Sequence, residues 1–310
     1  MTFAAWSLAR YTASGAIFAL VVASLTMALA RAVPTGDRED LDRTAEERAA
    51  YRAERGLDQP FLQQYLHWVA GLARLYFGRS SRYQRPVGDL LGERAANTAI
   101  LAVAAMLVAT VLGLPLGRLS GREPRGAGRV VRGLSLAVLS LPPLLSSLVL
   151  VFVAARTGWL PAGGMTSGGL AGAAWALDVL RHLPVPALAL ALPMAATLER
   201  LQARSMAEAL ARPFVTASLA RGLDRGTAAR VHAWPVSLAP VLGAYGVLVG
   251  SLFSGSFVVE LVTGWPGLGL LLFDALNARD VWLVAGCGAA GAVSLAIGTT
   301  LADVVHAAID

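Results

Sequence analysis

The residue types that most often carry catalysis or bind metals are few in this chain, and they are scattered. Its four histidines, His67, His182, His232 and His306, lie on different loops and segment ends. None is at metal-ligand spacing from another histidine or from Cys287, the single cysteine, which also excludes an internal disulfide. The sequence contains neither a G-x-S-x-G turn nor an H-E-x-x-H pair. We therefore expect no metal, no cofactor and no enzyme active site.

All 26 basic residues are Arg. A Walker A phosphate loop and Schiff-base chemistry both depend on Lys, so neither is expected here. If this protein takes part in ATP-driven work, a different chain must bind the ATP. The net charge of +6 does not indicate nucleic acid, because the Arg residues sit in loops beside apolar segments, where membrane topology explains them.

Of the 310 residues, 56% are hydrophobic, which is typical of a polytopic membrane protein rather than a soluble domain. Uncharged apolar stretches of roughly spanning length predict six transmembrane helices. The fourth is short and contains Pro184, Pro186 and Pro193, so we expect it to be kinked. A signal peptide that is cleaved after Ala30 is the alternative for the first stretch. The six stretches are Tyr11–Ala30, Thr98–Gly117, Gly133–Ala155, Leu183–Leu198, Val236–Val259 and Val281–Ala302.

Arginines crowd the loops after the second and the fourth expected span, whereas the short loops on the other side carry few. The positive-inside rule therefore predicts that both chain termini are cytoplasmic and that the long first loop is translocated. The first crowded loop holds Arg118, Arg122, Arg125, Arg129 and Arg132, and the second holds Arg200, Arg204, Arg212, Arg221, Arg225 and Arg230.

The second crowded loop contains a polar hairpin that runs from Pro213 to Trp234. Pro213 suits the first turn of a helix, and Gly222 can adopt the left-handed conformation that ends one. Asp224 is placed to cap a second helix up to Trp234, which Pro235 then breaks or kinks. Two helices joined by a glycine elbow would form a stiff lever that another protein can push. An ordinary helical connection is the alternative, and the pattern does not separate the two.

Small residues recur at four-residue steps inside the expected spans, which lets helices approach closely. The positions are Gly113 and Gly117, and then Gly246, Gly250 and Ser254. Packing is the main interpretation, and a polar path lined by Ser251, Ser254 and Ser256 is the alternative for the serines.

No charged residue falls in the interior of an expected span. Secondary transporters usually need such a residue to carry or balance charge, so this pattern argues against ion coupling. Glu260 and Asp303 lie at span ends, where a carboxylate is expected to reach headgroups or an Arg.

Several sequence blocks follow one another along nearly the whole chain. They include Gly56–Pro60, Gly158–Pro161, Leu180–Leu183, Gly264–Gly269 and Ala278–Asp280. In their order and spacing they resemble the permease subunits of bacterial dipeptide and oligopeptide ABC importers, in particular the first of the two permeases. The family's cytoplasmic loop carries the EAA motif, which docks on an ATPase subunit. Gly222 falls on its glycine, with Ala217 and Ser218 at two small positions, although Leu219 replaces a common Arg.

The resemblance implies an all-α integral membrane protein with the type I ABC importer permease fold in the bacterial cytoplasmic membrane. Residues 1–30 would form the first span, residues 31–95 an extracytoplasmic loop and residues 96–310 a core of five spans. Residues 212–235 would form the ATPase-coupling loop. Its coupling residues would be Phe214, Thr216, Ala217, Ser218, Ala220, Arg221, Gly222, Leu223 and Asp224.

The implied partners are a second, homologous permease, two ATP-binding subunits, an extracytoplasmic solute-binding protein and the lipid bilayer. Trp265, Pro266, Gly267 and Gly269 would face the binding protein, beside a short amphipathic helix at Leu268–Leu276. A channel or secondary carrier that works alone is the alternative. A second alternative is the same importer type for nickel chelates or sugars, because the binding protein largely determines which solute is carried.

Overall fold

The computed structural model describes residues 20–21, 24–25, 46, 60, 63, 65–66, 70–71, 76–123 and 125–307, without the side chains of residues 253 and 301–307. These residues are mainly helical, and the only strand pairing among them is an isolated bridge between Arg79 and Pro86. The all-α expectation is confirmed for this part of the chain. Contacts divide the chain into two compact units, Met1–Asn97 with Gly267–Ala296 and Thr98–Pro266 with Ile297–Asp310.

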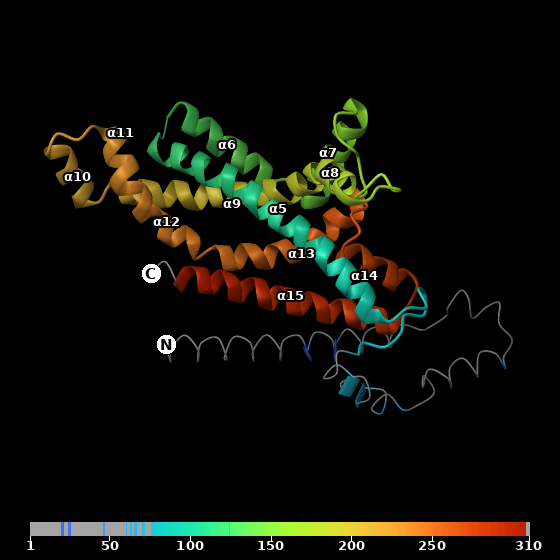
Figure 1. The fold of residues 1–310 in the computed structure, drawn as a ribbon. Helices are drawn as coiled ribbons and strands as arrows, with labels where there is room; N and C mark the ends of the chain where they lie inside the picture. Colours follow the sequence, from blue (N-terminus) through green and yellow to red (C-terminus); the bar gives the residue numbers. More distant parts are fainter. Residues whose placement is uncertain are drawn as a thin grey trace. The chain divides into compact units, whose positions relative to one another are not determined.

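The helices keep the labels of Figure 1. In chain order they are α5 (Val87–Arg122), α6 (Ala127–Leu139), α7 (Pro143–Thr157), α8 (Gly172–His182), α9 (Pro184–Leu210), α10 (Pro213–Ala220), α11 (Arg225–Ala228), the π-helical turn η1 (Ala229–Ala233), α12 (Trp234–Leu242), α13 (Tyr245–Thr263), α14 (Leu268–Asn277) and α15 (Val281–Ala307).

Within the described residues, three helices are long and apolar enough to cross a membrane, or up to five if each of two bent pairs counts as one span. The three are α5, α13 and α15, and the bent pairs are α6 with α7 and α8 with α9. The first expected span, Tyr11–Ala30, lies almost entirely outside the described residues. The number of six spans therefore stays a prediction.

The third expected span, Gly133–Ala155, is not one straight helix. It divides into α6 and α7, which meet at an angle of 104°. Pro142 has extended backbone angles, φ −58° and ψ 144°, and Pro143 starts α7. A residue before proline is disfavoured in the helical conformation, and proline has no N–H to continue a helix, so the pair enforces the break.

The bend near the fourth expected span lies at its first residue, between α8 and α9, and the helix is also longer than expected. α8 and α9 meet at 43° next to Pro184, whereas Pro193 lies inside α9. α9 continues to Leu210, well beyond the expected end at Leu198.

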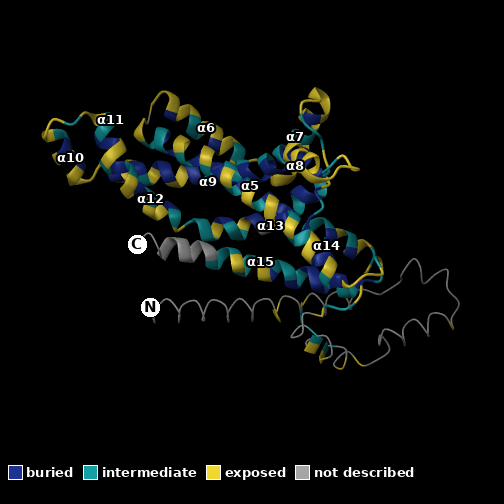
Figure 2. Ribbon diagram, viewed as in Figure 1, coloured by how far each residue is buried: buried dark blue, intermediate teal, exposed yellow. Residues whose placement is uncertain are grey.

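α9 forms the centre of the second unit. It packs against α6, α7, α12 and α13, and Figure 2 shows buried residues along much of its length. Leu190, Met194 and Leu198 of α9 belong to one buried cluster with Leu101 of α5 and Val241 of α12. Burial of these apolar side chains fixes the helices that lead into and out of the hairpin.

A row of glycines brings α5 directly against α9. A Cβ added at Gly113 would lie 2.8 Å from the Ala195 carbonyl oxygen, and one added at Gly117 would lie 2.6 Å from the Glu199 carbonyl oxygen. Gly121 extends the row by one more turn, with the Ala203 carbonyl oxygen at 2.5 Å. The expected close approach is confirmed for the first two glycines, while that for Gly246, Gly250 and Ser254 stays a prediction.

In the first unit, Asp280 fastens the segment before α5 to the turn between α14 and α15. Its Oδ2 accepts hydrogen bonds from the Ser80 hydroxyl at 2.6 Å and the Arg82 N–H at 3.2 Å. Its Oδ1 accepts from the Leu283 N–H, in the first turn of α15, at 3.1 Å. With all three donors supplied by the chain, this buried carboxylate acts as a structural anchor.

Candidate functional site

The first helix of the hairpin, α10, has the bounds that its sequence predicts at both ends. Pro213 occupies its first turn, and the chain leaves the helix at Gly222, whose φ is +92°. The Gly222 N–H donates to the Leu219 carbonyl at 3.0 Å, and the Leu223 N–H donates to the Ser218 carbonyl at 3.2 Å. These two bonds form a Schellman motif, which accounts for the glycine.

Asp224 caps the second helix, α11, as predicted. Its Oδ2 accepts a hydrogen bond from the Thr227 N–H at 2.9 Å. The side-chain and backbone hydrogen bonds from Thr227 hold the pKa of the Asp224 carboxyl below its ordinary value, because they stabilise the ionised form.

The second helix differs from the prediction further along. α11 ends at Ala228 and continues as the π turn η1 into α12, where Pro235 lies in the first turn. Pro235 therefore does not stop the helical path. The wider turn ends two residues before Pro235, which has no N–H to donate, and single π turns of this kind often mark functional sites.

The hairpin has a small apolar interior of its own and an exposed outer face. Val215 of α10 packs with Met206 and Ala209 of α9 and with Ala229 and Ala233 of η1. Figure 1 shows α10 and α11 beyond the last turn of α9 and the first turn of α12. The expected coupling residues Phe214, Thr216, Ala217, Ala220, Arg221, Gly222 and Asp224 are exposed, and Leu223 is partly buried.

Ser218 is the exception, because it is only 1% exposed. Its hydroxyl donates to the Phe214 carbonyl at 2.8 Å, so it supports α10 from within instead of offering a surface contact. Its side chain is therefore not part of the exposed outer face, and a role of Ser218 in ATPase coupling stays a prediction.

Three side-chain contacts join the helices at the root of the hairpin, where α5, α9 and α12 meet. The Ser120 hydroxyl of α5 donates to Glu199 Oε1 of α9. The Gln202 amide of α9 donates to the Ser237 hydroxyl of α12 at 2.7 Å.

The third contact places the Arg118 guanidinium 5.2 Å from the centre of the Trp234 ring. The sequence analysis missed Glu199 and Gln202. Their signal is that they continue the three- and four-residue steps of the buried positions Ala195, Leu198 and Met206.

Trp265, expected to face a binding protein, has no exposed surface and belongs to the buried core of the second unit. Its side chain therefore supports the turn after α13. Pro266 and Gly269 are partly buried and Gly267 is buried. The short helix expected at Leu268–Leu276 is present as α14, with Leu271 buried and Leu276 exposed.

The three serines proposed as a polar path do not share one face. Ser251 and Ser254 are exposed on α13, whereas Ser256 is 4% exposed. Ser256 follows Ser254 by two positions, which turns their side chains to nearly opposite sides of a helix. Ser251 and Ser254 remain candidates for a polar face, and Ser256 belongs to the interior.

Glu260 is also buried, with 0% exposure, and its Oε1 accepts a hydrogen bond from the Thr98 hydroxyl at 2.8 Å. Because α13 directs this side chain into the protein, it does not reach headgroups, and a structural role remains its interpretation. The side chain of Asp303 lies outside the described residues.

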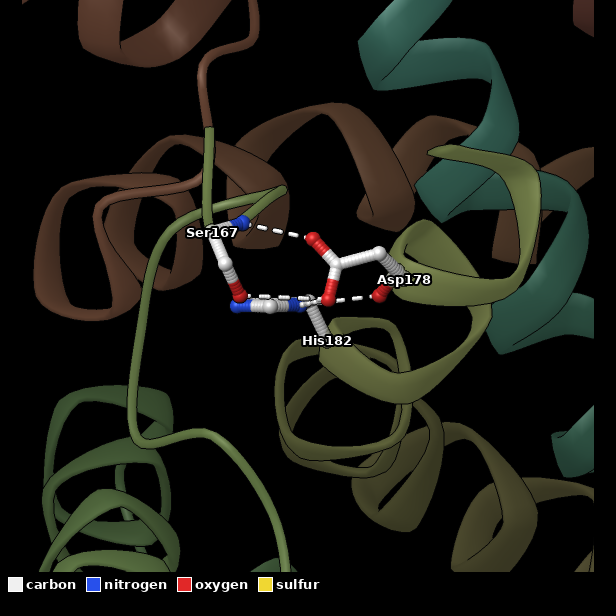
Figure 3. A network of polar contacts seen from close by, with 3 residues as sticks. All are labelled: Ser167, Asp178 and His182. Carbon is white, nitrogen blue, oxygen red and sulfur yellow. Dashed lines mark hydrogen bonds and ion pairs between the residues drawn. The ribbon is translucent and has the colours of Figure 1, made fainter. Parts of the chain in front are cut away.

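A Ser–Asp–His group lies where the α7–α8 loop (158–171) meets α8, as Figure 3 shows. Asp178 Oδ2 accepts from the Ser167 N–H at 2.6 Å, and its Oδ1 accepts from the Ser167 hydroxyl at 3.1 Å. His182 Nδ1 lies 2.8 Å from the Asp178 carbonyl oxygen. The serine hydroxyl bonds to the carboxylate and not to the imidazole, so this is no nucleophile–base pair. These bonds hold the α7–α8 loop against α8.

No group of three or more His, Cys, Asp or Glu side chains suited to a metal occurs among the described residues. The arrangement that stands out is instead mechanical. It is an exposed hairpin whose two legs, α9 and α12, are fastened by polar and apolar contacts to the rest of their unit.

The chain is similar to known membrane transport proteins over most of its length. Residues 113–310 match the family described as binding-protein-dependent transport system inner membrane component. The oligopeptide transport system permease protein OppB of Mycobacterium tuberculosis (strain ATCC 25618 / H37Rv) is 35% identical over 265 residues, which cover 82% of this chain and 81% of the relative. The dipeptide transport system permease protein DppB of Escherichia coli (strain K12) is 31% identical over 287 residues, 86% and 84% of the two chains. AppB of Bacillus subtilis (strain 168), also an oligopeptide permease, is 30% identical over 260 residues, 82% and 81%.

Proposed function

Because the chain belongs to the family of binding-protein-dependent transport system inner membrane components, we propose that it is one of two permease subunits of an ATP-driven peptide importer. It forms the peptide pathway with a second, homologous permease in the cytoplasmic membrane. Two ATP-binding subunits supply the energy, and an extracytoplasmic binding protein delivers the peptide. Peptides are the proposed cargo because the relatives named above are oligopeptide and dipeptide permeases.

The observation that carries this proposal is the outer face of the hairpin. On α10, the short side chains of Thr216, Ala217 and Ala220 form an exposed surface next to the exposed Phe214 ring. Beyond Gly222, no atom of the described residues lies within 4 Å of the place where a Cβ would be. A short helix with small exposed residues and an open elbow fits a groove on another protein.

The contacts at the root of the hairpin support a transmission role. Closure of the ATPases on ATP would push α10, and Val215 packs against the legs of the hairpin in one shared apolar cluster. The push would therefore move α9 and α12, which continue into the membrane part. ATP shifts this equilibrium only if the ATPases bind one state of the permease better, and the hairpin must convey that difference.

Exposed apolar side chains on α5 support a membrane location and a further protein contact. Val103, Leu107 and Val111 are between 60% and 68% exposed. They follow one another at four-residue steps and so form an apolar stripe along one side of the helix. Lipid and the second permease are the proposed neighbours of this stripe.

Site-specific crosslinking tests the proposal. A cysteine that replaces Ala220 should crosslink to an ATP-binding subunit in the assembled importer, while one that replaces Gly168 in the α7–α8 loop should not. The native Cys287 is buried, so it adds little background. If this chain, reconstituted alone and without ATPases, transports solute, the proposal is refuted and the protein is a channel or secondary carrier. Calorimetry of the partner binding protein with peptides, sugars and nickel chelates would identify the cargo.

A further inference from the structure

Glu199 and Gln202 present two polar atoms with unmet hydrogen-bonding capacity in the interior of the second unit. Glu199 is 1% exposed and Gln202 is 0% exposed. Glu199 Oε2 and Gln202 Oε1 are the buried side-chain atoms without a hydrogen-bond partner in the described part of the chain. Buried polar atoms are almost always paired, so two unpaired acceptors at neighbouring positions need a common explanation.

The two side chains lie together on one face of α9. Their spacing of three residues places them one turn apart on a helix. Both border Gly117 of α5, because a Cβ added there would lie 2.6 Å from the Glu199 carbonyl oxygen and 2.6 Å from Gln202 Cβ. From these neighbouring positions, the Glu199 carboxyl reaches Ser120 of α5 and the Gln202 amide reaches Ser237 of α12.

No basic side chain pairs with Glu199 among the described residues. Arg118 lies over the Trp234 ring, Arg204 pairs with Glu208 at 2.9 Å, and Arg200 is exposed. The groups that do contact the carboxyl and the amide are the hydroxyls of Ser120 and Ser237. An ionised carboxylate surrounded by neutral groups at this depth is costly, because burial without a counter-charge disfavours the charged form.

We propose that Glu199 is held as a neutral acid and that its Oε2–H donates to Gln202 Oε1. One proton then satisfies both unpaired atoms and keeps every hydrogen bond already present. The result is a continuous chain from Ser120 of α5, through Glu199 and Gln202 of α9, to Ser237 of α12. The Ser237 hydroxyl donates onward to the Trp234 carbonyl at 2.8 Å, at the junction of η1 with α12.

A rotated Gln202 amide is the competing arrangement, since amide oxygen and nitrogen are exchanged by a half-turn. The amide would then donate to an ionised Glu199, and Ser237 would have to give up its bond to Trp234. That arrangement leaves the negative charge buried, so the neutral acid is the better account.

Given the proposed function, Glu199 is a positioning residue for transport. The chain of hydrogen bonds crosses the three helices at the root of the hairpin, so they move as one body when the ATPases push on it. Without the chain, α9 and α12 could move apart, and ATP would be hydrolysed without delivery of peptide.

Infrared difference spectroscopy on the assembled importer tests the proton directly. The spectrum of the wild type minus that of Glu199→Gln should contain the carbonyl band of a protonated carboxylic acid, and the difference with Glu208→Gln, an exposed glutamate of the same helix, should not. If the Glu199 difference contains carboxylate bands alone, the neutral acid is refuted. This result does not depend on whether the importer carries peptides.

Coupling measurements test the positioning role. Glu199→Gln keeps an acceptor for Ser120 and a donor for Gln202. This variant should therefore hydrolyse as much ATP per transported peptide as the wild type does. Glu199→Leu should raise the ATP hydrolysed per peptide by roughly two- to thirtyfold, and Gln202→Leu should do the same. The double variant should be no worse than either single one, because both break one chain. Glu208→Leu should leave the ratio unchanged.

Normal coupling in Glu199→Leu, or additive effects in the double variant, would overturn the positioning role. Because the ratio is measured in an importer that binds its ATPases and transports, that failure would leave the proposed function intact. A wild-type complex that neither binds ATPases nor transports would refute the proposed function, while the infrared result would still decide the protonation of Glu199.

Discussion

The hairpin and the α7–α8 loop connect helices of the same compact unit, but they hold their shapes by different means. In the hairpin, the defining bonds join near neighbours in sequence, such as Leu223 to Ser218 and Thr227 to Asp224. In the α7–α8 loop they reach other elements, because the Gly164 N–H donates to the Thr263 carbonyl at the end of α13 at 2.8 Å and Ser167 binds Asp178 of α8.

This contrast extends to the glycines of the two regions. Gly222 is required for its positive φ, while the space around it is open. Gly163 has no positive φ, but a Cβ there would lie 2.7 Å from the Thr263 carbonyl oxygen. The hairpin therefore keeps its shape and leaves an outer face for a partner, whereas the loop fills its contacts within the chain. A self-contained shape with an unused face is what a lever needs.

Gly222→Glu should have the largest effect. We expect loss of ATPase binding and of peptide uptake with unchanged helix content, because the new side chain would occupy the open space at the elbow and strain the left-handed backbone. Uptake in proteoliposomes and co-purification of the ATPases measure it. Gly168→Glu is the matched control, since Gly168 has φ +81° and equally open surroundings in the α7–α8 loop, and it should keep ATPase binding. Normal uptake by Gly222→Glu would refute the lever.

Gly163→Ala should lower the free energy of unfolding of the chain in detergent by about 1–3 kcal/mol, the usual cost of forcing atoms into a packed site. Thermal denaturation followed by circular dichroism measures it. Gly168→Ala, which meets no atom within 4 Å, should cost only about 1 kcal/mol for its backbone conformation. Equal losses in the two variants would mean that the contact with Thr263 does not restrain the loop.

Asp178→Ala should release the α7–α8 loop while the hairpin stays as it is. The substitution removes both hydrogen bonds from Ser167 and the carboxylate beside His182. We expect faster limited proteolysis within residues 158–171 and unchanged cleavage within residues 213–233. Glu208→Ala, which removes an exposed ion pair, should change neither region. Unaltered cleavage of the loop in Asp178→Ala would show that the polar group does not hold it.

Protonation of the Asp224 carboxyl should give the smallest effect, a change with pH in the stability of the α11 cap. Because the pKa of its carboxyl is lowered in the folded hairpin, the cap stabilises α11 above the pKa of the unfolded carboxyl and is lost as the pH falls through the lowered folded value. Amide hydrogen exchange at Thr227 should therefore quicken on acidification after correction for the intrinsic rate. Asp224→Asn keeps an oxygen acceptor without titrating, so its corrected exchange should stay flat. The same acid dependence in that variant would place the titration elsewhere.

The same distinction explains which features were predictable. Pro213, Gly222 and Asp224 act on backbone within a few residues of themselves, so the sequence predicts both ends of α10 and the cap of α11, although not the π turn that follows. The Ser167–Asp178 bonds and the burial of Trp265 depend on elements that meet only after folding. Glu199 was missed because its position just after an apolar stretch suggests a span end, whereas the glycine row of α5 lets that helix pack directly on the part of α9 that contains Glu199. The residues of the proposed ATPase partner belong to another chain, so no pattern in this one specifies them.

The π turn at Ala229–Ala233 also makes the length of the hairpin matter. Each residue of an α-helix advances the direction of the side chains by about 100°, whereas a π turn accommodates more residues per revolution. This turn therefore sets the rotational phase of α12 relative to α11. A chain shortened by one residue within the π turn could close it to a regular α turn and keep Ser237 facing Gln202, whereas the same deletion inside α12 would rotate Ser237 away. A single deletion should thus be tolerated better within residues 229–233 than within α12.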